Sequence, residues 1–238
     1  RSNWQHNELR YCLRSLQANV EHLGKVVLVG HKPDWCTNVL HIPCDDPFEF
    51  SDQNMLWKAY HASKHDAISE VFLWCADDNV ILKKMNMVDF KAYHNGKIQE
   101  HTGDAFINRN SSSWTARIFI TMYYLQQRKL PAYDYDMPHV PMLWHKRLAE
   151  KVLSDWMAVW KEHPVTCSSL YFNSIPMLAR PEMPESYRIA VTGQFKTWKD
   201  IKAHCYRHKI MVHTDNGLND ALKTYLYKLF PTKSTFEL

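Results

Sequence analysis

The amino-acid sequence predicts an α/β protein whose first part holds a mainly parallel sheet and whose second part is rich in helices. Three observations support this class. Amphipathic helical segments alternate with short apolar runs over about the first 80 residues, as in a sheet with helical crossovers. Helical segments dominate beyond about residue 105, and nothing there resembles a flexible linker. We therefore expect one domain over 1–238, with parts at 1–105 and 106–238.

The elements of the first part follow from residue spacing and run length. Leucines and valines at helical spacing predict a helix over about 6–22. The other elements are short apolar runs and one helical segment, predicted at 25–30 (strand), 39–42 (strand), 53–66 (helix) and 71–75 (strand). The last strand runs directly into Asp77 and Asp78.

The second part is predicted from longer helical segments. Four helices and one short strand are expected, at 114–129 (helix), 144–163 (helix), 198–208 (helix), 210–213 (strand) and 217–230 (helix). A connection rich in Pro, Asp and Tyr, from Pro131 to Pro141, separates the first two helices. It contains His139 between two prolines.

The composition excludes the commonest nucleotide-binding loops. The chain has only 6 glycines, and no two of them form a Gly-x-Gly pair. Dinucleotide-binding and P-loop motifs both need clustered glycines to bring backbone amides onto phosphate. Any bound nucleotide must therefore be held by side chains or by a metal. The net charge of +4 is mild, so it permits anionic substrates without predicting a nucleic-acid binder.

The sequence is typical of a cytoplasmic protein. Its 6 cysteines show no Cys-x-x-Cys pair, which favours reduced thiols over a disulfide framework. The longest apolar run, about six residues at 71–76, is far shorter than the roughly 20 residues of a membrane span. No targeting signal is recognisable at the start of the chain.

Asp77 and Asp78 are the strongest local signal of chemistry. Ligands of open α/β sheets bind at the carboxyl ends of strands, and two adjacent carboxylates there suit a divalent cation that also touches phosphate. The alternative is an ordinary turn, because Asp and the following Asn79 both favour turns.

Two further features are candidates for binding or catalysis. Arg10 and Arg14 lie four residues apart on the first predicted helix, so both guanidinium groups would reach one diphosphate; a solvated helix face is the alternative. His139, confined between prolines, suits general acid–base work or metal ligation. A purely structural histidine is the alternative there.

Taken together, blocks along nearly the whole chain resemble the Stealth family of sugar-phosphate transferases of bacterial capsule synthesis. The blocks occur in the family's order and are Asn7–Leu16 (NELRYCLRSL), Val27–Pro33 (VLVGHKP), Phe72–Asp78 (FLWCADD), Asp136–Pro141 (DMPHVP), Gly217–Asp220 (GLND) and Phe230–Glu237 (FPTKSTFE). Two features depart from the family pattern. Ala76 stands where the family has Asn, and the family's first strand would lie upstream of residue 1.

The resemblance implies a fold like the A-type glycosyltransferases, with a Rossmann-like sheet and a nucleotide-sugar diphosphate bridged by Mn²⁺ or Mg²⁺. It implies a uridine diphosphate sugar as donor and a glycan as acceptor. Its matched blocks supply candidate metal ligands (Asp77, Asp78, Asp220), catalytic groups (His139, Asp78) and donor-binding groups (Asn7, Arg10, Arg14, Asn219). Arg109 and Arg117, which lie outside these blocks, are further candidates for binding the donor phosphates.

Three alternatives for function remain open at this point. Transfer of a glycosyl group would release a nucleoside diphosphate, whereas transfer of a sugar 1-phosphate would release a nucleoside monophosphate. The acceptor is a glycan or, as the rival, DNA carrying a hydroxylated modified base, as for a phage enzyme. The third alternative is a non-catalytic module that binds nucleotide sugars. Neither the identity of the sugar nor the oligomeric state follows from the sequence.

Overall fold

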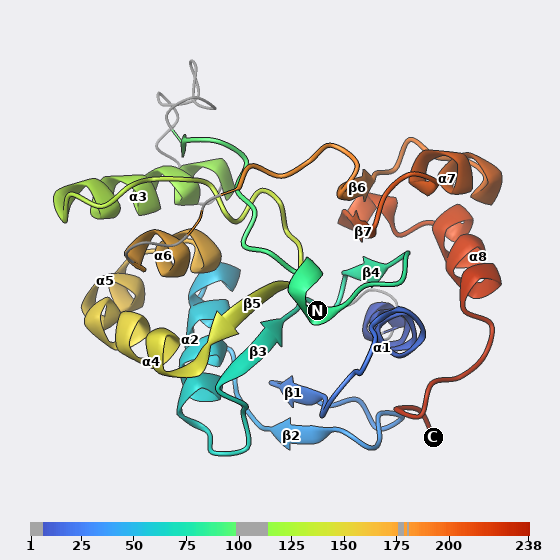
Figure 1. Cartoon of the computed structure of the whole chain (residues 1–238), viewed down its shortest axis with the longest axis horizontal. Coiled ribbons are helices and arrows are strands. Elements are labelled where there is room, and N and C mark those ends of the chain that lie inside the picture. Colours follow the sequence, from blue (N-terminus) through green and yellow to red (C-terminus); the bar gives the residue numbers. More distant parts are fainter. Residues whose placement is uncertain (1–6, 99–113, 176–178, 180) are drawn as a thin grey trace.

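The computed structural model describes residues 7–98, 114–175, 179 and 181–238 and shows a mixed α/β fold. Helices and strands alternate along the chain (Figure 1). The elements are α1 (Asn7–Asn19), β1 (Val27–Val29), β2 (Leu40–Ile42), α2 (Ser51–Lys64), β3 (Val71–Trp74), β4 (Val80–Ile81), α3 (Trp114–Gln127), β5 (Met142–His145), α4 (Lys146–Asp155), α5 (Met157–Glu162), α6 (Cys167–Ser174), β6 (Arg188–Val191), α7 (Trp198–Cys205), β7 (Ile210–His213) and α8 (Asp220–Leu229).

The strands form small mixed sheets, and the described residues do not show the one mainly parallel sheet that was predicted. β1 pairs with β2 in parallel, β3 pairs with β5 antiparallel, and β7 pairs antiparallel with β4 and parallel with β6. The sheets are mixed because of where in the sequence the paired strands lie. β3 and β4 each pair with a strand from the second half of the chain rather than with the next strand along a βαβ unit.

Most predicted elements are confirmed, with one clear exception at 144–163. There the chain first forms β5, in which Met142 and Trp144 are buried and pair with β3. The helix then breaks at Trp156, between α4 and α5. The indole of Trp156 is buried and donates to Ser174 Oγ at 2.9 Å, which anchors the break against α6.

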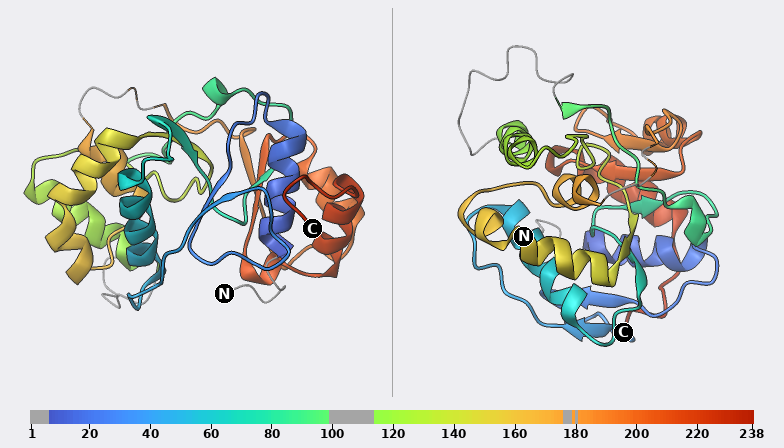
Figure 2. Two further views of the ribbon diagram at one scale, coloured as in Figure 1. Left: turned by 90° about the horizontal axis from the view of Figure 1, so that it is seen from below. Right: turned by 60° about the vertical axis from the view of Figure 1, so that its left-hand side comes forward.

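Two main apolar clusters form the core, and the larger one also includes Leu16 of α1, Ile81 of β4 and Ile210 of β7. Figures 1 and 2 show α2 to α6 gathered on one side of β3 and β5, and α1, α7 and α8 on the other side of the molecule, around β4, β6 and β7. The larger cluster holds Leu56, Trp144 and Trp160, and the smaller one holds Val80, Met211 and Leu226. In the described residues no helix is long and apolar enough to cross a bilayer.

Candidate active site

Asp77 and Asp78 lie in the short link between β3 and β4, where the chain leaves one sheet and enters another (Figure 1). β3 belongs to the sheet with β5, and β4 belongs to the sheet with β7 and β6. The link therefore sits at the junction between the two main parts of the fold. Three segments that are distant in sequence meet here: the β3–β4 link, the loop before β5, and the ends of β6 and β7.

Asn79 holds the link in shape. Its side chain is buried, and its Oδ1 accepts the Ala76 backbone N–H at 3.2 Å. Its Nδ2 donates both to Asp78 Oδ1 at 3.2 Å and to the carbonyl oxygen of His139 at 3.1 Å. A single buried amide thus ties the carboxylate of Asp78 to the histidine loop, so Asn79 does more than terminate the strand.

The loop that carries His139 is fixed by two aspartates. The Asp134 carboxylate is buried and accepts the backbone N–H groups of Asp136 and Met137 at 3.0 and 2.9 Å. The Asp136 carboxylate accepts the N–H groups of Ser168 and Ser169 at the start of α6, at 2.9 and 2.7 Å. These bonds satisfy donors that a helix N-terminus leaves unpaired, and they anchor the loop to α6.

His139 and Asp78, which lie 61 residues apart in sequence, are in direct contact. His139 Nε2 is 3.0 Å from both carboxylate oxygens of Asp78. The pair remains accessible, because the side chains are 44% and 23% exposed. The backbone of His139 is in the left-handed region at φ 46°, which is uncommon for a residue other than glycine. Strained backbone of this kind is frequent at functional sites.

Each member of the pair favours the charged form of the other. Burial lowers the pKa of His139, but the hydrogen bond and charge of Asp78 outweigh it, so the pKa lies above its ordinary value. Burial raises the pKa of Asp78, yet the hydrogen bond and charge of His139 leave it below its ordinary value. The contact therefore shifts His139 towards its protonated form and Asp78 towards its ionised form.

Asp77 differs from its neighbour. Its pKa is raised, first by removal from water and then by repulsion from the carboxylates of Asp78 and Glu8. Glu8 comes from the first turn of α1. Three carboxylates thus repel one another at this edge of the site, and an added cation would relieve that repulsion.

Two basic residues that the sequence analysis does not assign to this site also face this region. The register of β4 on β7 brings His213 beside Asp78, whose pKa His213 helps to lower. Arg188, at the start of β6, interacts electrostatically with Asp78, and its Nε–H is buried without a hydrogen-bond partner in the described chain. No local motif surrounds either residue. His213 reaches the site through the pairing of β7 with β4, whereas Arg188 pairs with Ile210 at the other end of β7 and is linked to Asp78 through its charge.

Arg117 contacts Asp52, a carboxylate that interacts electrostatically with His139. Arg117 Nε lies 2.5 Å from Asp52 Oδ2, and both side chains are 13% exposed. Burial raises the pKa of Asp52 to about 6, although the charge of Arg117 opposes the rise. Asp136 and His139 also contribute to this pKa. Arg117 therefore neutralises an internal carboxylate in this structure.

Arg10 and Arg14 are engaged by the C-terminal segment. Arg14 Nε and Nη2 each donate at 2.7 Å to the carboxylate of Glu237, and its Nη1 donates at 2.9 Å to the carbonyl oxygen of Phe230. Arg10 Nη1 donates to the same carboxylate at 3.0 Å, and its guanidinium covers the ring of Trp35. The predicted diphosphate clamp is therefore occupied by an internal carboxylate.

The remaining predicted residues are dispersed. Asn219 is the N-cap of α8: its Oδ1 accepts the Leu222 N–H at 3.1 Å and its Nδ2 donates to the Phe195 carbonyl oxygen at 3.0 Å. Asp220 is 99% exposed and faces Lys223 at 3.6 Å. Asn7 begins α1. Arg109 lies outside the described residues.

Asp220 does not join Asp77 and Asp78, which corrects the predicted set of three metal ligands. Within 7–98, 114–175, 179 and 181–238, no group of three His, Cys, Asp or Glu side chains is close enough to hold a metal ion. Any cation at this site would therefore rely on the Asp77–Asp78 link together with water and substrate oxygens. Mg²⁺ is commonly bound in this way, through one or two carboxylates and phosphate.

Comparison with known proteins adds no assignment. No protein-family model matches the chain, and no curated protein is detectably similar to it in sequence. The resemblance of the motif blocks therefore stays an expectation, and the function has to be inferred from the geometry around Asp78 and His139.

Proposed function

We propose that this protein is a transferase that moves a sugar unit from a nucleotide-sugar donor to an acceptor hydroxyl. The observation that carries the proposal is the contact between His139 Nε2 and the Asp78 carboxylate at 3.0 Å, next to a second carboxylate at Asp77. A histidine oriented by a carboxylate is suited to accept a proton from a hydroxyl group. The exposure of the pair leaves room for a substrate.

In its neutral form, with Nε2–H donated to Asp78, His139 would act as the general base. Asp78 contacts Nε2, so Nδ1 is the ring nitrogen that would take the acceptor proton. As the acceptor oxygen forms its new bond, that proton passes to His139, and Asp78 stabilises the resulting imidazolium. Asn79 keeps both groups in place, because it bonds to the Asp78 carboxylate and to the His139 backbone.

Arg188 would meet the donor phosphates. Its buried Nε–H has no partner in the described chain, and its charge interacts with that of Asp78. An arginine with unused donors binds phosphate oxygens through charge-assisted hydrogen bonds. Arg188 is thus a better candidate than Arg10 or Arg14, whose guanidinium groups already bind Glu237.

The residues of the β3–β4 link fit Mg²⁺ or Mn²⁺. Burial first, and then repulsion from Asp78 and Glu8, raise the pKa of Asp77. Asp77 and Asp78 would hold the cation, which when bound would offset the charge of the donor diphosphate. Asp220 is not part of this set because of its exposure and its distance from the group.

Two bonds are candidates for cleavage. In glycosyl transfer the acceptor oxygen bonds to the anomeric carbon, the bond between that carbon and the phosphate oxygen breaks, and a nucleoside diphosphate leaves. In sugar 1-phosphate transfer the acceptor oxygen bonds to the sugar-linked phosphorus, and a nucleoside monophosphate leaves. The acceptor proton goes to His139 in both. Chromatography of the released nucleotide distinguishes them.

The test uses conservative variants of the pair. Asp78→Asn and His139→Asn should each lower turnover of a uridine diphosphate sugar with Mn²⁺ by about 100-fold or more, with an unchanged melting temperature within about 2 °C. Asp66→Asn, an exposed aspartate outside the site, is the matched control and should retain full activity. Wild-type turnover in both Asp78→Asn and His139→Asn would overturn the proposal.

A non-catalytic binding module is the second candidate. It predicts that a uridine diphosphate sugar with Mn²⁺ raises the melting temperature of the wild-type protein while mass spectrometry detects no product with any acceptor. On the transferase proposal, the same donor is bound and also consumed. Thermal stabilisation and product analysis on one sample therefore separate the two.

A further inference from the structure

The excess positive charge of the chain is concentrated in one segment. Residues 196–228, which contain α7, β7 and α8, carry seven Lys or Arg against three Asp, whereas the rest of the chain carries 22 basic and 22 acidic residues. The whole net charge of +4 thus belongs to this segment. Such asymmetry within one chain indicates a surface for an anionic partner.

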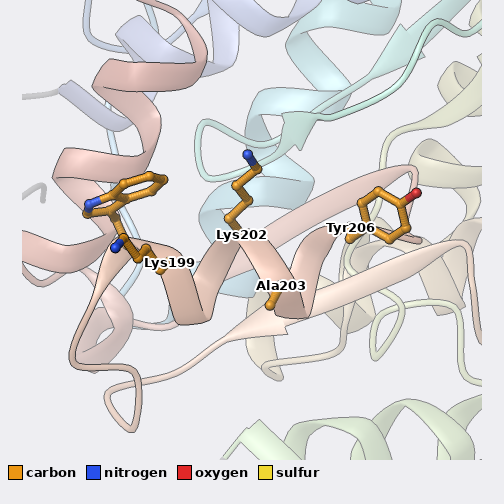
Figure 3. A pocket seen from close by; sticks show the side chains of 5 residues that line it. Lys199, Lys202, Ala203 and Tyr206 are labelled. Atoms are coloured by element: carbon orange, nitrogen blue, oxygen red, sulfur yellow. The ribbon is translucent and has the colours of Figure 1, made fainter.

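The charge accompanies an open hollow along α7. The hollow has a volume of about 540 Å³ and is lined by Trp198, Lys199, Lys202, Ala203 and Tyr206. Figure 3 shows Lys202 between Lys199 and Tyr206 on the same helix. None of these residues belongs to the Asp78–His139 site. The lining contains no acidic side chain, so an anion meets no opposing charge inside the hollow.

Aromatic rings are presented at both ends of the hollow. Tyr206 is 70% exposed, and Trp198 is half-buried. Eight residues separate them, which corresponds to about 12 Å along a helix. Further ammonium groups approach both rings: Lys228 Nζ lies 4.9 Å from the Trp198 ring and Lys83 Nζ lies 5.4 Å from the Tyr206 ring. Lysine ammonium groups and aromatic rings thus alternate along the hollow.

This chemistry fits a phosphodiester chain better than a glycan. Lysine ammonium groups only donate hydrogen bonds, whereas binding of neutral sugars also requires acceptors for hydroxyl hydrogens. Lys199 and Lys202 lie three residues apart, which places their Cβ atoms about 5–6 Å apart. Charges so close together match a polymer with one charge on every residue, as in nucleic acids. An acidic glycan with one charge per repeat unit places its charges farther apart.

We propose that the α7 hollow, defined by Trp198, Lys199, Lys202 and Tyr206, binds single-stranded nucleic acid. Lys199 and Lys202 contact phosphates, and unpaired bases stack on Tyr206 and Trp198, as in other sequence-tolerant sites for single strands. This surface goes beyond the proposed transferase activity. It is tested without any donor, so its failure and the failure of the transferase proposal are separate results.

The experiment measures fluorescence anisotropy of a labelled 20-nucleotide oligothymidylate with the full chain, from 50 to 300 mM NaCl. Wild-type binding should weaken steeply with salt. For single strands, the slope of log K against log salt is about −0.7 for each phosphate contacted. Lys199→Ala together with Lys202→Ala should therefore make the slope shallower by about 1.4. Tyr206→Ala should weaken binding about 5- to 150-fold through lost stacking.

Matched controls separate a local site from general charge. Lys25→Ala together with Lys91→Ala removes the same two charges from exposed positions elsewhere and should leave the slope nearly unchanged. Tyr227→Ala removes an aromatic residue of similar exposure, 63%, on α8 and should leave affinity unchanged. Equal effects of both lysine pairs, tighter binding to polygalacturonate than to the oligonucleotide, or no binding at 50 mM NaCl would each overturn the proposal.

Discussion

Two charged pairs in this molecule use similar residues in opposite ways. The Arg14–Glu237 pair ties α1 to the C-terminal segment and is closed to solvent, with side chains 9% and 0% exposed. The Asp78–His139 pair lies between two sheets and is open, with side chains 23% and 44% exposed. The sequence blocks that contain both pairs look equally functional. Their different exposure to solvent shows that the first pair is a structural ion pair, whereas the second can be reached by a substrate.

The difference lies in how completely the carboxylates are bonded. Glu237 Oε1 accepts from Arg14 Nε and from the backbone N–H and hydroxyl of Ser234, and its Oε2 accepts from Arg14 and Arg10. These bonds outweigh burial and lower the pKa of Glu237. Asp78 has two side-chain partners, His139 and Asn79, and faces solvent. A carboxylate with capacity left over can bind a ligand.

The largest expected effect comes from breaking the closed pair. Glu237→Ala leaves the Arg14 guanidinium buried without its partner and should lower the free energy of unfolding by about 3–5 kcal/mol, as measured by urea denaturation. Asp155→Ala, which breaks the exposed pair with Lys151 at 2.6 Å, should cost less than about 1 kcal/mol. Equal losses in the two variants would contradict a special role for the closed pair.

Asp52 and Glu237 should affect stability oppositely as the pH changes, because burial raises the pKa of Asp52 whereas hydrogen bonds lower that of Glu237. Asp52 has a pKa raised to about 6 from 3.8, so the folded state holds its proton more tightly than the unfolded state. Relative to a variant with an uncharged residue at position 52, the wild-type protein therefore becomes less stable as the pH rises from about 4 to above 6. The free energy of unfolding of the wild type, relative to Asp52→Asn, should fall by about 3 kcal/mol across that range.

Urea denaturation at pH 4, 5, 6 and 7 provides this measurement. Any constant cost of leaving Arg117 beside an amide cancels, because only the change with pH is compared. A stability difference that stays constant from pH 4 to pH 7 would show that Asp52 titrates normally. Asp66→Asn, at an exposed position, is the matched control and should show no such trend.

Local elements were predictable from the sequence, whereas strand partners were not. The leucine spacing that predicts a helix over 6–22 is a property of one segment, and α1 occupies Asn7–Asn19. β5 is different. Only four residues long, it leads directly into α4 and shows no clear period of its own, and its last two residues fall within the helix predicted at 144–163. Its pairing with β3 depends on the tertiary fold.

The candidate site follows the same division. Asp78 and His139 could each be predicted from their residue types and neighbours, but their contact spans 61 residues. The spacing of Arg10 and Arg14 predicts phosphate binding, but it cannot reveal that Arg14 has a partner 223 residues away at Glu237. Arg188 gave no signal at all, since one arginine at the start of a strand matches no motif.

A smaller effect is expected at Asn219, which the sequence suggested as a donor-binding residue. In the structure its amide caps α8 and bonds to Phe195. Asn219→Ala should therefore lower the free energy of unfolding by about 1 kcal/mol and leave donor affinity unchanged in a thermal-shift titration. Thr197→Ala, which removes the corresponding cap of α7, is the matched control. Lost donor affinity with unchanged stability would restore the binding role.

The smallest effect on stability is expected at the open pair itself. Because the pKa of His139 is raised, its contribution is complete below pH 6.5 and is lost as the pH rises through the folded-state pKa. Because the pKa of Asp78 is lowered, its contribution is present above pH 3.8 and is lost as the pH falls through the folded-state pKa. The coupling is therefore greatest in the window between those values.

A double-mutant cycle of Asp78→Asn and His139→Asn at pH 6 should give about 0.2–1 kcal/mol, because solvent screens the exposed pair. Nuclear magnetic resonance titration should place the pKa of His139 lower in Asp78→Asn than in the wild type. A coupling above 3 kcal/mol would mean that this pair is a structural ion pair like Arg14–Glu237, which would remove the basis for a substrate site.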